Sequence, residues 1–436
     1  MTLFFFMVGN FFLLHGFYQL IKYFIIASEI KKKYLVTEKT SPPSYHNIIV
    51  FVPVLHEETT IERFIEDISN QTYPSENFQT YIITTEKENL VNKNKGSSNT
   101  IDIVNQILLQ KKYRYRHFHY PNSDGHKTDQ LDFAFQKICS EIGRDKVVDT
   151  FFLFLDADSE VDSGLIERFN HSIEDKIELY QQPLLWFKNI STLQNKLMKS
   201  FSFLQSFFSI SYEIPMFVGK FFPWRLKYLV GNGLFIRGSY LLKVRGFPPL
   251  IEDVRLGRLS SFLQTEIKLV PGFGNVETAK DFLTYIKQSS VWFFGCGLFV
   301  SDYIFAKSLK DATKITAKDA VRIGYGFFKA FRWMNKGLLH LLGLVFSIIH
   351  ANQALLLLFT ISLIMNSSIP VLVVAFNFRK KWGERISVLK KIEILLEGVI
   401  FSPAFYVLNF LGPYYGLFKL FKYYLCGTVT LPKTIR

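Results

Sequence analysis

The sequence has few cysteines and no His-x-x-x-His pair. These absences exclude the common ligand spacings of zinc sites and a disulfide framework. Its 436 residues hold three cysteines, Cys139, Cys296 and Cys426, which lie far apart and match no zinc spacing or disulfide framework. None of the nine histidines belongs to a His-x-x-x-His pair. We therefore expect the histidines to be structural, and nothing in the cysteines requires an oxidising compartment.

The chain also lacks a stripe of aromatic residues alternating with arginine, although its formal net charge is +14. We therefore expect no nucleic-acid partner. The positive charge instead indicates membrane lipids as partners or a positive-inside membrane topology. Hydrophobic residues make up 49% of the sequence, and phenylalanine alone occurs 46 times. This composition is too apolar for a disordered chain and high for a fully soluble enzyme.

The N-terminal apolar run lacks the preceding positive charge of a cleavable signal peptide. Residues 3–27 are almost all apolar, and three lysines follow at 31–33. The run is long enough to cross about 30 Å of hydrocarbon. We therefore expect an uncleaved transmembrane anchor over residues 1–30, with the chain entering the cytoplasm after it. The predicted location is the cell membrane, with several spans and a cytoplasmic catalytic domain.

After a Thr-Ser-Pro-Pro linker at residues 40–43, strand and helix patterns alternate. Strands are predicted at 47–53, 79–85, 116–120, 151–155 and 231–237, and helices at 59–70, 100–111 and 128–142. This order predicts an α/β fold with a doubly wound sheet over residues 45–290. Residues 291–337, aromatic and weakly charged, are expected to form interfacial helices.

The remaining residues, 338–436, are expected to form a C-terminal transmembrane region and a basic tail. Residues 338–378 are nearly uncharged and are interrupted at 366–370, which predicts two spans. A further span is predicted at 394–418. An odd number of spans cannot return the basic tail to the cytoplasm, so one segment is expected to be re-entrant or interfacial.

The pattern that organises the chain is the apolar run 151–155, followed at once by Asp156 and Asp158. Such a run is typical of a strand buried on both faces, and open α/β sheets bind ligands at the carboxyl ends of their strands. Two hard carboxylate ligands at that point suit Mg²⁺ or Mn²⁺. Taken alone, the same pattern also describes a strand-to-loop turn capped by aspartates.

Further polar segments accompany this pattern in a defined order. The first strand ends at Pro53 and is followed by Glu57, and Lys127 stands at the start of the third helix. A glycine-flanked segment at 231–237 leads to the carboxylate pair Glu252 and Asp253. Read alone, Lys127 is a solvated loop lysine and the pair is a helix cap.

In this order and spacing the segments resemble the inverting family-2 glycosyltransferases, above all the membrane-embedded group of cellulose and hyaluronan synthases. The resemblance covers about residues 46–300 and implies a GT-A type domain with flanking transmembrane helices. It implies that a nucleotide sugar is bound by Pro53, Glu57, Glu86, Lys127 and Asp156. It implies acceptor or diphosphate contacts for Gly231, Asn232, Gln288 and Trp292.

Three departures from the family pattern stand out. His56 replaces the asparagine of the family's Pro-x-x-Asn-Glu segment. Where the second strand of the family ends in aspartates that read the nucleobase, this chain has Thr84-Thr-Glu-Lys-Glu88, in which Glu86 or Glu88 is the candidate substitute. Val291 replaces the arginine of Gln-x-x-Arg-Trp, which leaves a diphosphate contact to Arg322, Lys287 or neither and weakens the case for a processive polymerase.

The chemistry gives each group a role. A metal held by Asp156 and Asp158 would stabilise the diphosphate leaving group. Asp253 at a helix start would take the acceptor proton as general base, with Glu252 beside it. One base without a second nucleophile implies inversion.

We therefore expect a membrane-bound, metal-dependent glycosyltransferase using a nucleotide sugar, most simply UDP-linked. The acceptor would be a lipid-linked or growing glycan in cell-envelope or extracellular polysaccharide synthesis. The alternatives are a processive polysaccharide synthase and a catalytically inactive glycan-assembly subunit. A transporter is disfavoured by the large soluble α/β segment.

Overall fold

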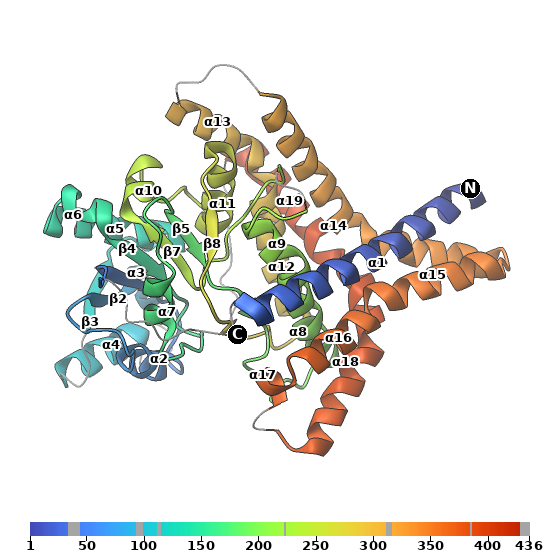
Figure 1. Cartoon of the computed structure of the whole chain (residues 1–436), viewed down its shortest axis with the longest axis horizontal. Helices are drawn as coiled ribbons and strands as arrows, with labels where there is room; N and C mark the ends of the chain where they lie inside the picture. Colours follow the sequence, from blue (N-terminus) through green and yellow to red (C-terminus); the bar gives the residue numbers. More distant parts are fainter. Residues whose placement is uncertain are drawn as a thin grey trace.

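The computed structural model describes an α/β domain joined to a bundle of long helices (Figure 1). The described residues are 1–33, 44–92, 99–110, 115–221, 224–310, 316–383 and 386–427. The predicted linker at 40–43 and the end of the basic tail lie outside them.

The strands that the structure describes are Ile48–Pro53 (β1), Phe78–Thr85 (β2), Tyr115–Tyr120 (β3), Phe151–Phe154 (β4), Leu179–Gln181 (β5), Leu184–Leu185 (β6), Leu234–Arg237 (β7), Ile267–Leu269 (β8) and Gly274–Asn275 (β9). Seven of them form one sheet in the order β3-β2-β1-β4-β7-β5-β8, while β6 and β9 pair separately. The first four strands of that order run parallel. The predicted α/β class and all five predicted strands are confirmed.

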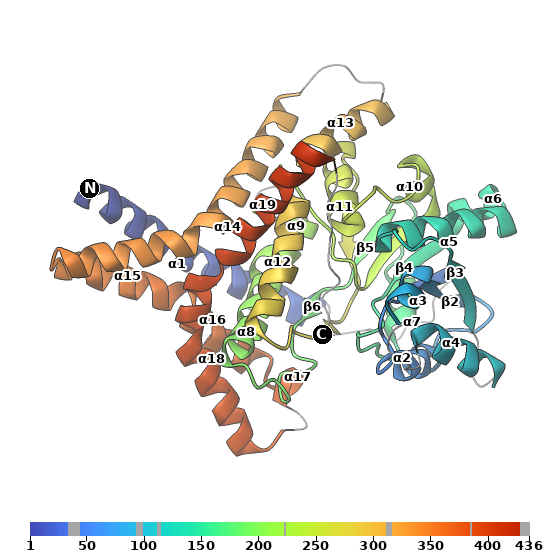
Figure 2. The same cartoon turned by 180° about the vertical axis from the view of Figure 1, so that it is seen from behind.

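The helices around the sheet are Ile61–Ser69 (α2), Glu86–Asn92 (α3), Thr100–Leu109 (α4), Lys127–Ile142 (α5), Arg144–Asp149 (α6), Leu165–His171 (α7), Gly238–Lys243 (α10) and Glu252–Leu263 (α11). The bundle comprises Thr2–Lys33 (α1), Lys196–Phe208 (α8), Ser209–Glu213 (η1), Ile214–Phe217 (α9), Phe282–Gly297 (α12), Phe299–Lys310 (α13), Ala317–Ile349 (α14), Gln353–Asn366 (α15), Ser368–Asn377 (α16), Arg379–Gly383 (α17), Val388–Leu408 (α18) and Leu411–Cys426 (α19). Seen from behind, α12 and α19 lie beside α14 (Figure 2).

Both faces of the sheet are buried, as the uninterrupted apolar run in β4 predicts. Phe151 faces a core shared with Phe64 of α2. Phe152, on the opposite face, belongs to a core that includes Phe135 of α5 and extends to Tyr23 of α1. The second core is continuous between the sheet and the helix bundle, so packing positions the two parts relative to each other.

Strand β7 runs antiparallel to both of its neighbours, β4 and β5. Its amino end therefore lies at the same edge of the sheet as the carboxyl ends of β1 and β4. This reversal brings the segment just before β7 over the turn that follows β4. A parallel β7 would have placed that segment at the opposite edge.

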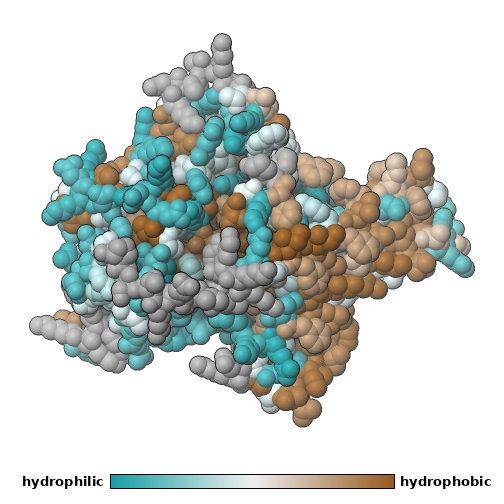
Figure 3. All heavy atoms as spheres, viewed as in Figure 1, coloured by the Kyte–Doolittle hydropathy of each residue, from teal (hydrophilic) through white to brown (hydrophobic). Residues whose placement is uncertain are grey.

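Three helical stretches are long and apolar enough to cross a membrane, namely Thr2–Ile30, Gln353–Asn377 and Val388–Cys426. The pair Phe282–Gly297 and Phe299–Leu309 passes the same test together but is bent by 44°. Hydrophobic side chains cover the bundle side of the molecule in Figure 3, whereas hydrophilic ones cover the sheet side. This distribution is the one expected for membrane association.

The expected pair of spans in residues 338–378 takes a different form. The first part belongs to the end of α14, and the chain turns at His350–Asn352, where Ala351 has a positive φ of 45°. α15 and α16 together then give one span-length stretch across the predicted break at 366–370. Ser367, a polar residue that is fully buried at this break, donates its hydroxyl to the carbonyl of Leu363.

Helix α11, which begins at the carboxylate pair, is held by close packing and by buried charge. A Cβ at Gly257 would lie 2.3 Å from the Leu229 nitrogen, so only glycine lets the helix approach this segment. Asp302 of α13, fully buried, accepts hydrogen bonds from Arg255 at 2.5 Å and from Arg258 at 3.1 Å. The position of α11 is therefore set from two sides.

We predict that Gly257→Ala destabilises the protein by about 1 to 3 kcal/mol, the usual cost of overpacking. The added methyl must displace the backbone at Tyr228 and Leu229. Thermal unfolding in detergent measures the change. Gly324→Ala in α14 is the control, since nothing lies within 4 Å of its added Cβ. Equal stability of the Gly257 variant and this control would contradict the packing argument.

Candidate active site

The turn after β4 carries Asp156 and Asp158 and is fastened by a neighbouring loop. The side-chain oxygen of Asn232, which is buried, accepts the backbone N–H of Asp156 at 3.2 Å. The same oxygen accepts the hydroxyl of Ser159 at 2.8 Å. Gly233, with a φ of +66°, donates its N–H to the carbonyl of Phe154 at 2.9 Å. The segment before β7 thus holds the aspartate turn in one conformation.

Lys127, at the first position of α5, connects this turn to α11. Its ammonium lies 2.8 Å from Oδ1 of Asp156 and 3.5 Å from Oε1 of Glu252. Burial lowers the pKa of Lys127, but the carboxylates of Asp156, Glu252 and Asp253 outweigh burial and hold it above its ordinary value. Lys127 therefore stays charged and relieves the repulsion between carboxylates that come from different elements.

Glu252 and Asp253 form the first turn of α11, as predicted, but their surroundings differ. Glu252 is buried and accepts the hydroxyl of Thr128 at 3.2 Å. Asp253 accepts the N–H of Val254 at 2.7 Å. Burial and the Glu252 carboxylate raise the pKa of Asp253 to about 7, while Lys127 opposes the rise. An acid with this pKa exchanges a proton readily near neutral pH.

Gly231 leaves a small open space between the lysine and the aspartate. A Cβ at this position would lie 3.0 Å from Oδ2 of Asp253 and 3.3 Å from Nζ of Lys127. The glycine therefore keeps both charged atoms accessible from the same point. Sequence spacing alone does not reveal this role.

A cavity of about 670 Å³ opens over this arrangement. The residues lining it include nearly all of the predicted site: Pro53, Glu57, Lys127, Asp156, Asp158, Gly231, Asn232, Glu252, Asp253, Gln288 and Trp292. These residues come from segments that are up to 239 positions apart in the chain, and tertiary structure brings them to one cavity.

Glu86 is the predicted site residue that does not line the cavity. It begins α3, where its carboxylate lies 3.1 Å from Nε2 of His119. Its neighbour Lys87 lines the cavity instead, with its ammonium bonded to the carbonyl of Gly125 at 3.3 Å. The predicted strand ends where α3 begins, and the Glu86 carboxylate faces His119 of β3.

Helix α12 forms an aromatic wall of the cavity. Trp292 lies 5.8 Å from Trp186 and 6.5 Å from Tyr285, measured between ring centroids. Gln288 is buried, and its side-chain oxygen has no hydrogen-bond partner among the described residues. A buried amide oxygen without a partner at a cavity wall is available to a ligand donor. Val291 also lines the cavity, whereas neither Arg322 nor Lys287 does.

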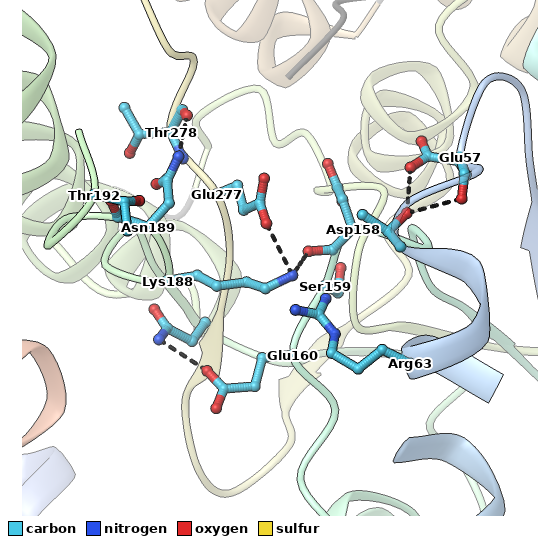
Figure 4. A network of polar contacts seen from close by, with 12 residues as sticks. Glu57, Arg63, Asp158, Ser159, Glu160, Lys188, Asn189, Thr192, Glu277 and Thr278 are labelled. Carbon is cyan, nitrogen blue, oxygen red and sulfur yellow. Dashed lines mark hydrogen bonds and ion pairs between the residues drawn. The ribbon is translucent and has the colours of Figure 1, made fainter. Parts of the chain in front are cut away.

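Lys188 is a functional residue that the sequence analysis missed. Its ammonium lies 3.1 Å from Oε1 of Glu277 and also donates to the backbone carbonyl of Asp158 (Figure 4). The side chain is only 8% exposed, so both contacts are shielded from water. No spacing in the sequence links these three residues. Lys188 therefore holds the aspartate turn at Asp158, in addition to the bonds that Asn232 makes with Asp156 and Ser159.

Asp156 and Asp158 offer a donor set that suits Mg²⁺ or Mn²⁺, since both are carboxylates that line the cavity. A separate group, His56, Glu58 and Glu88, also has ligand atoms within 4.8 Å of one another. The oxygens of Glu88 accept the backbone N–H groups of His56 and Thr100 at 3.2 and 2.7 Å. Those bonds fit a structural role for Glu88.

No protein-family model and no curated protein matches the chain. Among solved structures, the chain is similar to the mannosyltransferase PcManGT from Pyrobaculum calidifontis in complex with GDP-Man and Mn²⁺. The identity is 13% and the TM-score 0.49, over 95% of this chain and 98% of that one. It is also similar to residues 1–349 of S. aureus TarS in complex with UDP-GlcNAc, at 11% identity and a TM-score of 0.42, over 89% and 98% of the two chains. At such values these likenesses carry no functional argument, which rests on the site itself.

We predict that Lys188→Met lowers the free energy of unfolding by about 1.5 to 3 kcal/mol, the range for hydrogen bonds to charged groups. The variant keeps an apolar stem but leaves Glu277 and the Asp158 carbonyl without the ammonium. Hydrogen exchange of residues 155–160 should also quicken. Lys268→Met, which removes the exposed pair with Glu174, is the control and should change stability by at most about 1 kcal/mol. Unchanged exchange in the Lys188 variant would remove its positioning role.

Proposed function

We propose that the protein is a membrane-bound glycosyltransferase of the GT-A type that transfers a sugar from a nucleotide donor with inversion. The observation that carries this proposal is the placement of Asp253, with a pKa of about 7, across one small open space from Lys127 and its partner Asp156. A base thus faces a group of charges suited to a diphosphate and its metal. The aromatic wall at Trp292 offers a flat apolar surface for a sugar ring.

The residues of this chain divide the work of the reaction. An acceptor hydroxyl, deprotonated by Asp253, attacks the anomeric carbon of the donor sugar. The new bond forms as the bond from that carbon to the diphosphate oxygen breaks, and the nucleoside diphosphate leaves with the electron pair. The hydroxyl proton ends on Asp253. Glu252 positions Lys127 and raises the pKa of the base.

Asp156 and Asp158 would hold Mg²⁺ or Mn²⁺, which supplies Lewis-acid stabilisation of the departing diphosphate. Lys127 adds a positive charge beside them. Pro53 and Glu57 at the end of β1 are assigned to the nucleotide side, and Gln288 and Trp292 to the acceptor side. Glu86, bonded to His119, is retained only as a weak candidate for nucleobase contact.

The proposal places the active site on the cytoplasmic side, where nucleotide sugars are made. The lysines at 31–33 after the first span support this orientation. The proposal also keeps the domain boundaries expected from the sequence, with the catalytic domain over residues 45–290. The rival inactive subunit is disfavoured because it has no chemical need for a base with a pKa near 7.

The test is donor hydrolysis and transfer by the full-length protein, screened across UDP-, GDP- and TDP-sugars with Mn²⁺. With the active donor, Asp253→Asn should lower turnover by about 10²- to 10⁴-fold, because the amide cannot accept the proton. Affinity for the nucleoside diphosphate should stay within a few-fold of wild type. Glu252→Gln should be milder. Absence of activity with every donor, or near-normal turnover of Asp253→Asn, would contradict the proposal.

The pH profile gives an independent check of the base. Asp253 acts only when ionised, so turnover should fall as the pH drops through about 7 and level off above it. Glu252→Gln removes a carboxylate that raises this pKa, so the acidic limb should move to lower pH. The residual rate of Asp253→Asn should lack the limb. An unchanged limb in that variant would assign the titration to another group.

A further inference from the structure

The cavity extends beyond the proposed active site into the helix bundle. Its far wall comes from α1, α15 and α16, of which α1 and α15 lie next to α14 (Figure 1). The residues of this wall are His15, Gly16, Gln19, Met365, Asn366 and Pro370. They fall near the middle of the span-length stretches Thr2–Ile30 and Gln353–Asn377. The cavity therefore reaches from the sheet edge to membrane depth.

Helix α14 presents three cationic side chains to this part of the cavity. Lys329, Arg332 and Lys336 all line it, at spacings of three and four residues. These spacings place side chains on one face of an α-helix. The cations therefore form a row along the cavity, and Trp333 lines it beside them.

The row is held by neutral and aromatic groups. The guanidinium of Arg332 lies 2.8 Å from Nε2 of His15. The ammonium of Lys329 lies 4.3 Å from the ring centre of Tyr228, and that of Lys336 lies 4.8 Å from the ring centre of Tyr406. Among the residues that the structure describes, none of the three cations forms an ion pair within 4.0 Å, and the Glu213 carboxylate attracts Lys329 from farther away.

Such charges are costly at membrane depth unless an anion joins them. Aromatic faces contribute only about 0.5 to 2 kcal/mol each. The nearby Glu213, which also lines the cavity, already accepts the hydroxyls of Ser209 and Tyr228, both at 2.8 Å. Basic pockets between transmembrane helices are known sites for anionic lipid headgroups. The row thus matches the charge of a phosphate.

We infer that Lys329, Arg332 and Lys336 bind the phosphate headgroup of a membrane lipid that serves as the acceptor. This inference rests on the proposed function and names the chemical class of its acceptor. The headgroup enters the far part of the cavity, and the lipid chain remains among the apolar helices. A sugar attached to that phosphate extends past Trp292 toward Asp253 and supplies the hydroxyl that attacks the donor.

The depth of the cavity favours a lipid over a polymer that passes through the membrane. No described residue in the ranges 2–14 or 353–364 lines the cavity, so it ends near the middle of both spans. A through-channel would continue along these ranges. A neutral glycan chain would also gain little from three cations, whereas a phosphate pairs with them directly.

The experiment measures binding of geranylgeranyl phosphate to the full-length protein in detergent, read by tryptophan fluorescence because Trp292 and Trp333 line the cavity. The double variant Arg332→Gln/Lys336→Gln should bind it at least about tenfold more weakly. The charge-preserving Arg332→Lys/Lys336→Arg should bind within a few-fold of wild type. Lys380→Gln/Lys381→Gln, which removes two exposed charges from α17, is the matched control and should bind normally.

Three further probes identify the source of the phosphate. Geranylgeraniol, which lacks the phosphate, should bind equally weakly to wild type and variant. Inorganic phosphate should compete poorly, since it lacks the chain. The affinity for UDP with Mn²⁺ should be unchanged in the double glutamine variant.

The inference is overturned if that variant binds geranylgeranyl phosphate normally, or if inorganic phosphate competes equally well. Loss of UDP affinity in the variant would assign the row to the donor diphosphate. Preferential binding of a neutral oligosaccharide would assign the cavity to a polymer. Donor hydrolysis in the absence of lipid is measured in parallel. Hydrolysis without lipid-phosphate binding defeats this inference alone, whereas absence of hydrolysis with every donor defeats the proposed function.

Discussion

The site depends on one ammonium among carboxylates that the fold draws from separate elements. Lys127 of α5 contacts Asp156 after β4 and Glu252 of α11, and both carboxylates are partly or wholly removed from water. Without the cation, these negative charges would repel one another across a space of low polarity. Lys127 therefore allows the turn after β4 and the start of α11 to lie close together. Asp253 forms no ion pair within 4.0 Å with a described residue, and burial together with the Glu252 carboxylate raises its pKa to about 7.

Further contacts at this edge of the sheet hold Lys127 and the surrounding carboxylates in place. Because β7 is antiparallel to β4, Asn232 reaches the aspartate turn and accepts the N–H of Asp156. Lys188 donates to the carbonyl of Asp158 in the same turn. Gly257 and the Asp302 ion pairs fix the axis of α11. Each of these features is a buried polar contact or a close approach between backbone segments. Rigid support of this kind holds reacting groups in position before a substrate arrives.

The α/β domain and the helix bundle share one hydrophobic core and one cavity. A hydrophobic core runs from Phe152 in the sheet to Tyr23 in α1, so the helix bundle is packed directly onto the α/β domain. The cavity follows the same course, from carboxylates at the sheet edge, past aromatic rings, to the cationic face of α14. Under the proposed function, this order of surfaces would place the anionic donor at the sheet edge and the acceptor among the helices.

The sequence by itself determined the local elements and pointed to many of the residues that line the cavity. Apolar runs and helical spacings are local signals, so β1, β2, β4 and α5 could be predicted, together with Asp156 after β4 and Asp253 at the start of α11. Tertiary structure decided what depends on distant contacts. It turned Glu86 toward His119, put Lys188 against Asp158 and left Gly231 as an open space. It also gathered Lys329, Arg332 and Lys336 around a cavity, because burial and pairing arise only when elements far apart in the chain pack together.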